Sequence, residues 1–248
     1  DPVLFSYLAT LCQPETKQPT INALVRILYE NLFRAVVNHE FPRKPSRVTT
    51  RMAAKHHEGI FTAELVDRNQ KVVCVDLARA GTWPSHVCYE SLNYLLDPDQ
   101  VRQDHMIMSR VTNEAHQVTG TSYAGCKIGG PIDDSIVLIP DPMGATGSTI
   151  IQALDLYKNG FGGTIRTGKA KKFIALHLIV TPEYLKNVGS RHSDLVVYAL
   201  RLDRGLSPPD VLGTRPGEKW DQERGLNEEQ YIVPGGGGFG EILNNAYV

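Results

Sequence analysis

The sequence predicts an α/β fold with a central parallel sheet flanked by helices. Five short runs rich in β-branched residues alternate with stretches of helical periodicity, a pattern typical of parallel strands joined by crossover helices. The chain has 248 residues, enough for one α/β domain with a substantial apolar core. It contains no internal repeat and no low-complexity tract, so we treat residues 1–248 as a single domain.

The first predicted element is an amphipathic helix over residues 20–40, where apolar residues recur at intervals of three and four. The predicted strands follow at residues 71–77, 105–110, 135–140, 172–180 and 194–200. Helices are predicted over residues 84–96 and 148–158, and an Asn-Gly pair after the second supplies a left-handed end. Residues 207–225 are dense in proline, glycine and charge, which predicts a loop or a partly ordered insertion.

The charge of the chain argues against a polyanionic partner. Lysine and arginine number 26, aspartate and glutamate 27, and the formal net charge is -1. A nearly neutral protein has no field that would concentrate nucleic acid or anionic lipid. We therefore expect small-molecule substrates, with no nucleic acid and no membrane as partner.

The spacing of the cysteines and the lack of a long apolar stretch indicate the cellular compartment. The four cysteines are far apart and form no Cys-x-x-Cys pair, so we expect reduced thiols. The sequence shows no signal-peptide pattern and no apolar stretch of roughly 20 residues, the length that crosses a bilayer. A cytoplasmic location is the expectation from these two observations.

Residues 136–154, IVLIPDPMGATGSTIIQAL, join a buried strand to a helix through an acidic and hydroxyl-rich turn. In an open parallel sheet, ligands bind beyond the carboxyl ends of strands, where the next helix presents free N–H groups. Gly147 lets the backbone approach an anion, and Thr146, Ser148 and Thr149 add hydroxyl donors, which suits a phosphate monoester. Asp141 is better suited to accept hydrogen bonds from sugar hydroxyls and to favour a cationic reacting carbon.

Each of these residues also has a purely structural explanation. Ser148 or Thr149 would serve as a helix N-cap, and Asp141 would end a strand. Taken singly, these explanations are the stronger ones. Taken together, a phosphate cradle, a sugar-binding carboxylate and a site for a cationic carbon indicate a phosphorylated ribose.

Three segments carry a resemblance to a known family. Residues 137–149, VLIPDPMGATGST, resemble the phosphoribosyl pyrophosphate (PRPP) motif of type I phosphoribosyltransferases, and their DPM-x-AT-G form is similar to that of uracil phosphoribosyltransferases. Residues 231–241, YIVPGGGGFGE, resemble the uracil-binding segment of the same family, and residues 77–81, LARAG, resemble its pyrophosphate loop. The order and spacing of the three agree with that family.

The resemblance implies a type I phosphoribosyltransferase core over about residues 56–200. It also implies a hood, built from about residues 1–55 and 200–248, with residues 207–225 as an insertion. The implied reaction joins uracil to the phosphoribosyl group of PRPP and gives UMP and pyrophosphate. Mg²⁺ would arrive with the substrate's pyrophosphate rather than on dedicated protein ligands, and a homo-oligomer, a dimer or larger, is implied as well.

The resemblance also implies roles for particular residues. The 5'-phosphate is assigned to the loop made of Ala145, Thr146, Gly147, Ser148 and Thr149. The leaving pyrophosphate is assigned to Arg79, Ala80 and Gly81. Asp141 would bind the ribose hydroxyls, and Arg110 would begin a flexible loop over residues 111–130 that closes over the substrate. Asp141, Arg79 and Arg110 would therefore carry the catalytic roles.

Uracil is assigned to Met143, Tyr231, Ile232, Gly237 and Phe239. In the family the base is read mainly by main-chain groups, and a planar base with alternating carbonyl and N–H groups allows this. The chain departs from the family pattern at the end of this segment. Gly238 stands where the family has an aspartate, Glu241 where it has a second one, and Ile242 where it has an arginine. Glu241 is a possible replacement for the missing hood carboxylate.

Two other functions stay open on the sequence alone. The altered segment at Gly238 would also suit a phosphoribosyltransferase for another nucleobase. A chain that keeps the Asp141 loop but has lost a hood carboxylate would also suit a non-catalytic regulator that binds PRPP or UMP.

Overall fold

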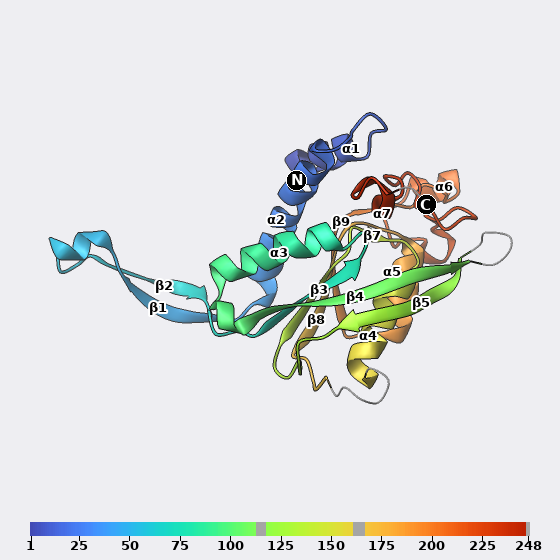
Figure 1. Ribbon diagram of the computed structural model, residues 1–248. Coiled ribbons are helices and arrows are strands. Elements are labelled where there is room, and N and C mark those ends of the chain that lie inside the picture. The colour runs from blue at the N-terminus through green and yellow to red at the C-terminus, as the bar shows by residue number, and fades with distance from the viewer. Residues whose placement is uncertain (113–117, 161–166, 247–248) are drawn as a thin grey trace.

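The computed structural model describes residues 1–112, 118–160 and 167–246, without the side chains of residues 109–123. The predicted α/β fold is confirmed: a mostly parallel sheet lies between helices (Figure 1). Its strands are β3 (Val72–Ala78), β4 (Val101–Thr112), β5 (Val118–Lys127), β6 (Ile136–Pro140), β7 (Met143–Gly144), β8 (Lys172–Val180) and β9 (Leu195–Leu202). They follow the order β5-β4-β3-β6-β8-β7, and β9 also pairs with β8.

The five predicted strands correspond to β3, β4, β6, β8 and β9, and the helix over residues 20–40 is α2. The helices are α1 (Pro2–Leu11), α2 (Thr20–Glu40), α3 (Thr82–Leu95), α4 (Ser148–Asn159), α5 (Pro182–Arg191), α6 (Pro209–Leu212) and α7 (Phe239–Ile242). Three short 3₁₀ turns are η1 (Arg51–Ala54), η2 (Pro98–Gln100) and η3 (Trp220–Gln222). Helices α1 and α5 were not predicted, although Thr181 caps α5 and a proline opens it, both ordinary helix-start signals.

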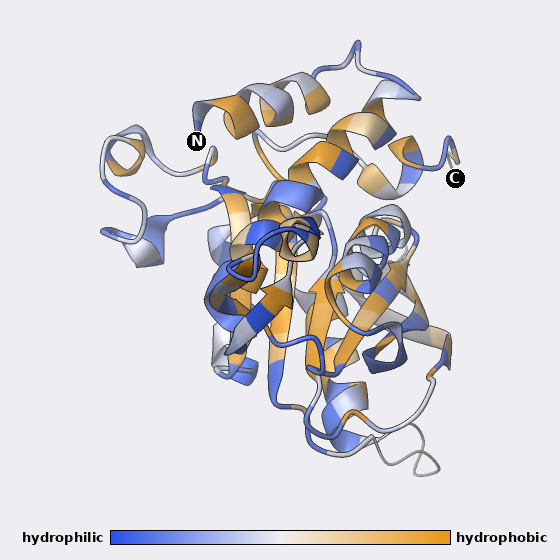
Figure 2. Ribbon diagram, turned by 90° about the vertical axis from the view of Figure 1, so that its left-hand side faces the viewer, coloured by the Kyte–Doolittle hydropathy of each residue, from blue (hydrophilic) through white to orange (hydrophobic). Residues whose placement is uncertain are grey.

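Alternate residues of each strand supply two separate cores, one on each face of the sheet. In β3, Val72 and Cys74 pack with α1, α2 and α3, while Val73, Val75 and Leu77 pack with α4 and α5. This division follows from the two-residue period of a strand. Both faces are covered, so the central strands β3, β6 and β8 are largely hydrophobic and buried, and Figure 2 shows a band of apolar strands behind polar loops.

The sheet reverses its order of connection at β3. The chain passes from β3 to β4 on one side and then returns to β6 on the other side, both parallel to β3. In open α/β sheets, such a switch point leaves a crevice at the carboxyl ends of the two strands, where ligands bind. The segments after β3 and β6 are the two that carry Arg79 and Asp141.

One predicted loop is wrong. Residues 111–130 were expected as a flexible loop, but β4 extends to Thr112 and residues 118–127 form β5, which pairs antiparallel with β4. Residues 113–117 lie outside the described residues. The sequence of β5, VTGTSYAGCK, contains valine, threonine and tyrosine, which favour strands once a partner strand is available. The parallel sheet therefore has an antiparallel strand at one edge.

Helix α1 and the C-terminal segment lie above the carboxyl ends of the strands, and α2 continues from there along one face of the sheet (Figure 1). Phe239 and Leu243 join the core that α1 and α2 form, and the Gln18 side-chain amide donates to the Leu243 carbonyl at 3.0 Å. Segments at the two ends of the chain thus form one cover over the sheet.

The predicted insertion at residues 207–225 is irregular but well anchored. It contains α6 and η3, and the Arg204 guanidinium donates to the carbonyls of Val211 and Leu212 at 3.0 and 3.3 Å. Arg204 also pairs with the buried Glu223 carboxylate at 3.3 Å. Arg204, just before the insertion, thus contacts both an early part of it, at Val211 and Leu212, and a late part, at Glu223.

A long antiparallel hairpin, β1 (Arg43–Thr49) and β2 (Ile60–Val66), projects away from the body (Figure 1). It was not predicted. Its exposed apolar side chains include Val48, Met52 and Phe61. The boundary expected near residue 56 falls in the connection between β1 and β2, so a single hairpin spans it.

In the part of the chain that the structure describes, no helix is long and apolar enough to span a membrane. The four cysteines are free thiols, and Cys74 and Cys88 are buried in the core, where burial raises the pKa of both well above the ordinary value.

Candidate active site

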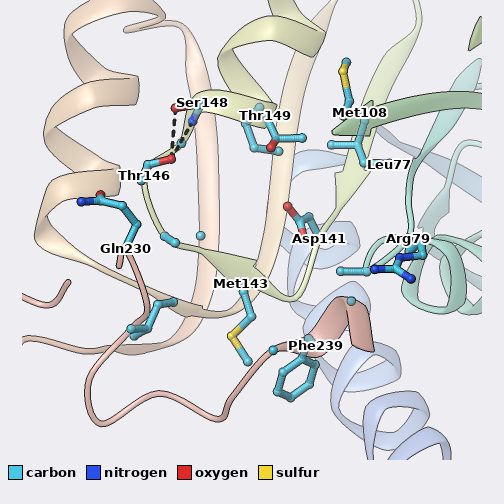
Figure 3. Close-up of a pocket in the computed structure, with 18 of the residues that line it drawn as sticks. Leu77, Arg79, Met108, Asp141, Met143, Thr146, Ser148, Thr149, Gln230 and Phe239 are labelled. Atoms are coloured by element: carbon cyan, nitrogen blue, oxygen red, sulfur yellow. Dashed lines mark hydrogen bonds between the residues drawn. The ribbon is translucent and has the colours of Figure 1, made fainter. Parts of the chain in front are cut away.

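A cavity of about 560 Å³ lies over the carboxyl ends of β3 and β6. Three segments form most of its lining: the stretch after β3, the turn from β6 into α4, and the C-terminal segment (Figure 3). These are the three segments that carried the family resemblance, and the fold brings them together although 149 residues, 82–230, separate the first from the last. The size and shape suit a small molecule.

The turn into α4 has the geometry of an anion site. Gly147 precedes the first turn of α4 with φ +81°, a conformation that glycine adopts without strain. The Thr146 and Ser148 hydroxyls lie 3.0 Å apart, and the Ser148 N–H donates to Thr146 Oγ1 at 3.3 Å. Ala145, Thr146, Gly147, Ser148 and Thr149 all line the cavity. The helix start adds the positive end of its dipole to these donors.

Asp141 lies between this turn and Arg79 in the cavity (Figure 3). Its N–H donates to the Leu176 carbonyl at 3.0 Å, which ties the residue to β8. Buried Tyr29 and Tyr184 lie close enough to sense its charge. Burial raises the pKa of both hydroxyls well above the ordinary value, and the negative charge of Asp141 is the second cause.

His177 supports Asp141 from inside the sheet. The Asp141 carbonyl can only accept, so His177 Nδ1 donates to it at 2.5 Å, and Nε2 then accepts from the Tyr184 hydroxyl at 2.6 Å. The imidazole is fully buried, and burial lowers the pKa of His177 from 6.5 to about 4. The ring is therefore neutral at physiological pH.

Acidification is expected to destabilise the fold through His177. Between pH 6.5 and about 4 the unfolded chain binds a proton that the folded chain does not, so stability falls as the pH falls through this window. The difference corresponds to a loss on the order of 3 kcal/mol. Denaturant unfolding at pH 7 and pH 4 would measure it, and His177→Gln should reduce the pH dependence; an unchanged dependence would contradict the assignment.

The segment after β3 places Arg79 and Ala80 at the cavity wall. Arg79 is exposed, and its guanidinium donates to the Ala246 carbonyl of the C-terminal segment at 3.3 Å. Gly81 is buried below them rather than lining the cavity; an added Cβ would lie 2.7 Å from the Leu77 carbonyl oxygen. Arg110 belongs to β4, but its side chain is outside the described residues.

The C-terminal segment supplies the remaining wall. Tyr231, Ile232, Gly237 and Phe239 line the cavity together with Met143 from the turn after β6. Figure 3 shows Met143 and Phe239 at one end of the pocket and Thr146 and Ser148 at another. An apolar end for a base and a polar end for a phosphate are thus separated within one cavity.

An ion pair between partly buried Arg201 and buried Asp203 holds the glycine-rich part of this segment. The Arg201 guanidinium contacts the Asp203 carboxylate at 2.5 and 2.8 Å, and both groups reach Gly235. Asp203 accepts from the Gly235 N–H at 2.8 Å, and Arg201 donates to the Gly235 carbonyl at 3.1 Å. Because both backbone groups of one glycine are held, the segment has a defined path despite four consecutive glycines.

Gly238 departs from the family pattern, and the Glu241 side chain lies where a side chain at position 238 would be. A Cβ added to Gly238 would lie 2.0 Å from Glu241 Oε2, so the Glu241 carboxylate occupies the space of a side chain at position 238. Glu241 and Gly238 both line the cavity. A carboxylate is therefore present beside position 238, supplied from three residues further along the chain.

Sequence reasoning missed several residues of the site. Arg201 and Asp203 hold Gly235 from outside the cavity, and the lining residues that were missed are Leu77, Ile107, Met108, Tyr184 and Gln230. Asp203 directly follows β9, a position at the carboxyl end of a strand that the sequence could have flagged, whereas Met108 lies within β4. Tyr184 and Gln230 had no such signal. Gln230 adopts φ +64° and lines the same cavity as Thr146.

Comparison with known proteins places the chain in a family. A family model described as uracil phosphoribosyltransferase matches residues 1–218. A uracil phosphoribosyltransferase of Mycoplasma mycoides subsp. mycoides is 25% identical over 246 residues, which cover 98% of this chain and 94% of that protein. One from Thermosipho melanesiensis is 34% identical over 112 residues, which cover 45% of this chain and 40% of that protein.

Among solved structures, the AQ2163 protein from Aquifex aeolicus has a TM-score of 0.72 at 19% identity, covering 100% of this chain and 96% of that one, which supports the fold alone. The matched family model ends before residues 231–241, whereas the alignment with the Mycoplasma mycoides relative covers nearly the whole chain. Since the family model covers well over half of the sequence, the chain belongs to the uracil phosphoribosyltransferase family.

Proposed function

We propose that the chain transfers the phosphoribosyl group of PRPP to uracil, giving UMP and pyrophosphate. Family membership and the names of its relatives support this reaction. The main observation in its support is a single cavity, around which the Thr146–Ser148 turn, Asp141 and a wall formed by Met143 and Phe239 are arranged. These three features match, in order, a 5'-phosphate, a ribose and a planar base.

The reaction requires positioning more than proton transfer. Substitution at an anomeric carbon passes through a cationic state, as glycoside cleavage does. Asp141, close to the proposed ribose site, would stabilise that positive charge and accept from the sugar hydroxyls. Arg79 would bind the departing pyrophosphate, whose negative charge grows as the bond breaks. The base, held by the C-terminal segment, would attack through its ring nitrogen.

Magnesium fits this site as part of the substrate. In the described residues, no group of three or more histidine, cysteine, aspartate or glutamate side chains could hold a metal ion by itself. Mg²⁺ usually binds one or two carboxylates together with substrate phosphates, and Asp141 and Glu241 line the cavity. When bound with the pyrophosphate, Mg²⁺ would supply positive charge to the leaving group.

The direct test is product formation. The purified protein, Mg²⁺ and PRPP are mixed with uracil, cytosine, hypoxanthine, adenine and orotate in one reaction, and nucleotides are separated by chromatography. UMP as the main product would support the proposal. A different nucleotide would assign another base, and binding of PRPP without release of pyrophosphate would indicate a regulator instead of an enzyme.

Glu241 is proposed to act as the hood carboxylate in place of a residue at position 238. Glu241→Gln is expected to lower kcat/KM by roughly 10- to 100-fold, the range for groups that support a metal–substrate complex. The double variant Gly238→Asp with Glu241→Ala should recover much of the loss, because it returns a carboxylate to the same space. UMP formation rates would measure both effects.

Glu228→Gln, which changes an exposed carboxylate outside the cavity, is the matched control for this pair. Equal activity of Glu241→Gln and Glu228→Gln would remove Glu241 from the site.

Self-association and a cytoplasmic location stay predictions. The projecting β1–β2 hairpin, with its exposed apolar side chains, supports self-association, which sedimentation analysis would test.

A further inference from the structure

The backbone carbonyl groups of the turn after β6 are held by one continuous stretch of chain behind it. Carbonyl oxygens at five of the six positions from 141 to 146 accept hydrogen bonds from residues 177–187. The Asp141 carbonyl accepts from His177 Nδ1 at 2.5 Å, and the Pro142 carbonyl accepts from the N–H groups of Leu178 and Ile179 at 3.0 and 3.1 Å. The Gly144 carbonyl accepts from the Thr181 N–H at 3.1 Å, and the Ala145 carbonyl accepts from Thr181 Oγ1 at 2.7 Å. The Thr146 carbonyl accepts from Asn187 Nδ2 at 2.8 Å.

This arrangement determines which way the N–H groups of the turn face. In a trans peptide unit, the carbonyl of one residue and the N–H of the next point in opposite directions. Holding the Ala145 and Thr146 carbonyls against α5 therefore turns the N–H groups of Thr146 and Gly147 the other way. Neither N–H donates to another described residue. Both residues line the cavity, so these donors are available to an anion there.

A carbonyl oxygen turned into the cavity would have the opposite effect. It carries partial negative charge, would repel a phosphate, and would remove an N–H donor from the same position. The side chains that hold the carbonyls back thus favour anion binding without touching the anion.

We propose that Asn187 and Thr181 are positioning residues for the 5'-phosphate of the substrate, because they orient the peptide units on either side of Thr146. The inference rests on the proposed function and deepens it. It assigns the phosphate affinity of the turn partly to β8 and α5, which lie outside the sequence motif.

Asn187 is the more informative of the two residues. It is partly exposed on α5, and its side-chain amide donates to the Thr146 carbonyl. Thr181 is fully buried, and its hydroxyl also accepts from the Tyr184 N–H at 3.0 Å to cap α5. Removing that hydroxyl would lower the stability of α5 and would also disturb the geometry of the turn. Thr181 is therefore best tested by the contrast between Thr181→Ser, which keeps the hydroxyl, and Thr181→Val, which loses it.

The main experiment compares Asn187→Ala and Asn187→Asp with wild type. Asn93 offers a matched control, because its amide donates to the Tyr89 carbonyl at 2.8 Å on helix α3 and it is also partly buried. The readouts are KM for PRPP, KM for uracil, kcat, the melting temperature, and the Kd of ribose 5-phosphate by calorimetry.

Asn187→Ala is expected to raise KM for PRPP and Kd for ribose 5-phosphate by about three- to tenfold, the effect of one neutral hydrogen bond. Asn187→Asp should do more, because a carboxylate cannot donate to the carbonyl and adds negative charge near the phosphate. KM for uracil should stay within twofold of wild type in both. Asn93→Ala should leave all ligand constants unchanged, and Thr181→Ser should keep the phosphate affinity that Thr181→Val loses.

Unchanged binding of ribose 5-phosphate by both Asn187 variants would overturn the inference. Equal increases in both KM values together with a lower melting temperature would do the same, since they would indicate a general structural role. A wild-type protein that neither binds PRPP nor forms UMP would instead refute the proposed function.

Discussion

Replacing Asp141 with asparagine is expected to lower UMP formation by about 10²- to 10³-fold, the range seen when one preorganised charge-stabilising group is removed from an active site. Asparagine keeps the shape and one acceptor oxygen but loses the negative charge beside the cationic reacting carbon. The loss should therefore appear mainly in kcat. Steady-state kinetics with PRPP and uracil would measure it.

The Asp141 variant should fold normally. Its main-chain contacts to Leu176 and His177 do not involve the carboxylate, so the melting temperature should be close to that of wild type. Asp221→Asn, an exposed change outside the cavity, controls for loss of a surface charge. Wild-type rates of UMP formation by Asp141→Asn would show that the charge of this carboxylate has no catalytic role.

Gly147→Ala is expected to produce the second large effect, by distorting the phosphate turn. A Cβ at this position would lie 2.6 Å from Val188 Cγ2, and the backbone φ of +81° is strained for any residue with a side chain. The two terms together should cost about 2 kcal/mol or more in stability. KM for PRPP should rise at least about tenfold, because the N–H groups that face the phosphate move with the backbone.

Two companion variants separate the causes of the Gly147 effect. Gly189→Ala, where an added Cβ meets nothing within 4 Å, should leave both stability and KM nearly unchanged. Val188→Ala combined with Gly147→Ala relieves the contact but not the backbone strain, so it should recover part of the stability. Normal PRPP affinity in Gly147→Ala would show that this turn does not bind the phosphate.

The core strands could be predicted from local patterns because both faces of the sheet are covered. Strands such as β6 and β8 are then apolar along their whole length, and that composition is visible without any partner. The β1–β2 hairpin and β5 escaped prediction for the opposite reason. Much of the hairpin is exposed, so it has no apolar pattern, and β5 depends on pairing with β4 more than on its own residues.

The residues of the site fall into the same two groups, those with a local sequence pattern and those brought in by tertiary contacts. The turn at Asp141 to Thr149 and the segment at residues 231–241 each have a short local pattern, so their ligands could be inferred from residue types. Arg201, Asp203 and Asn187 act on those segments through contacts between residues far apart in the chain, as when Asp203 holds Gly235. Such a contact leaves no short-range pattern in the amino-acid sequence.

The sequence by itself determined the α/β class, the family and the chemical character of the three segments around the cavity, because these follow from short-range residue patterns. Only the tertiary structure decided that the Glu241 carboxylate fills the space beside Gly238 and that Thr181 and Asn187 hold the Ala145 and Thr146 carbonyls. The physical reason is that both depend on the meeting of separate peptide segments in space, where the distance between two atoms, and not their order in the chain, sets the interaction.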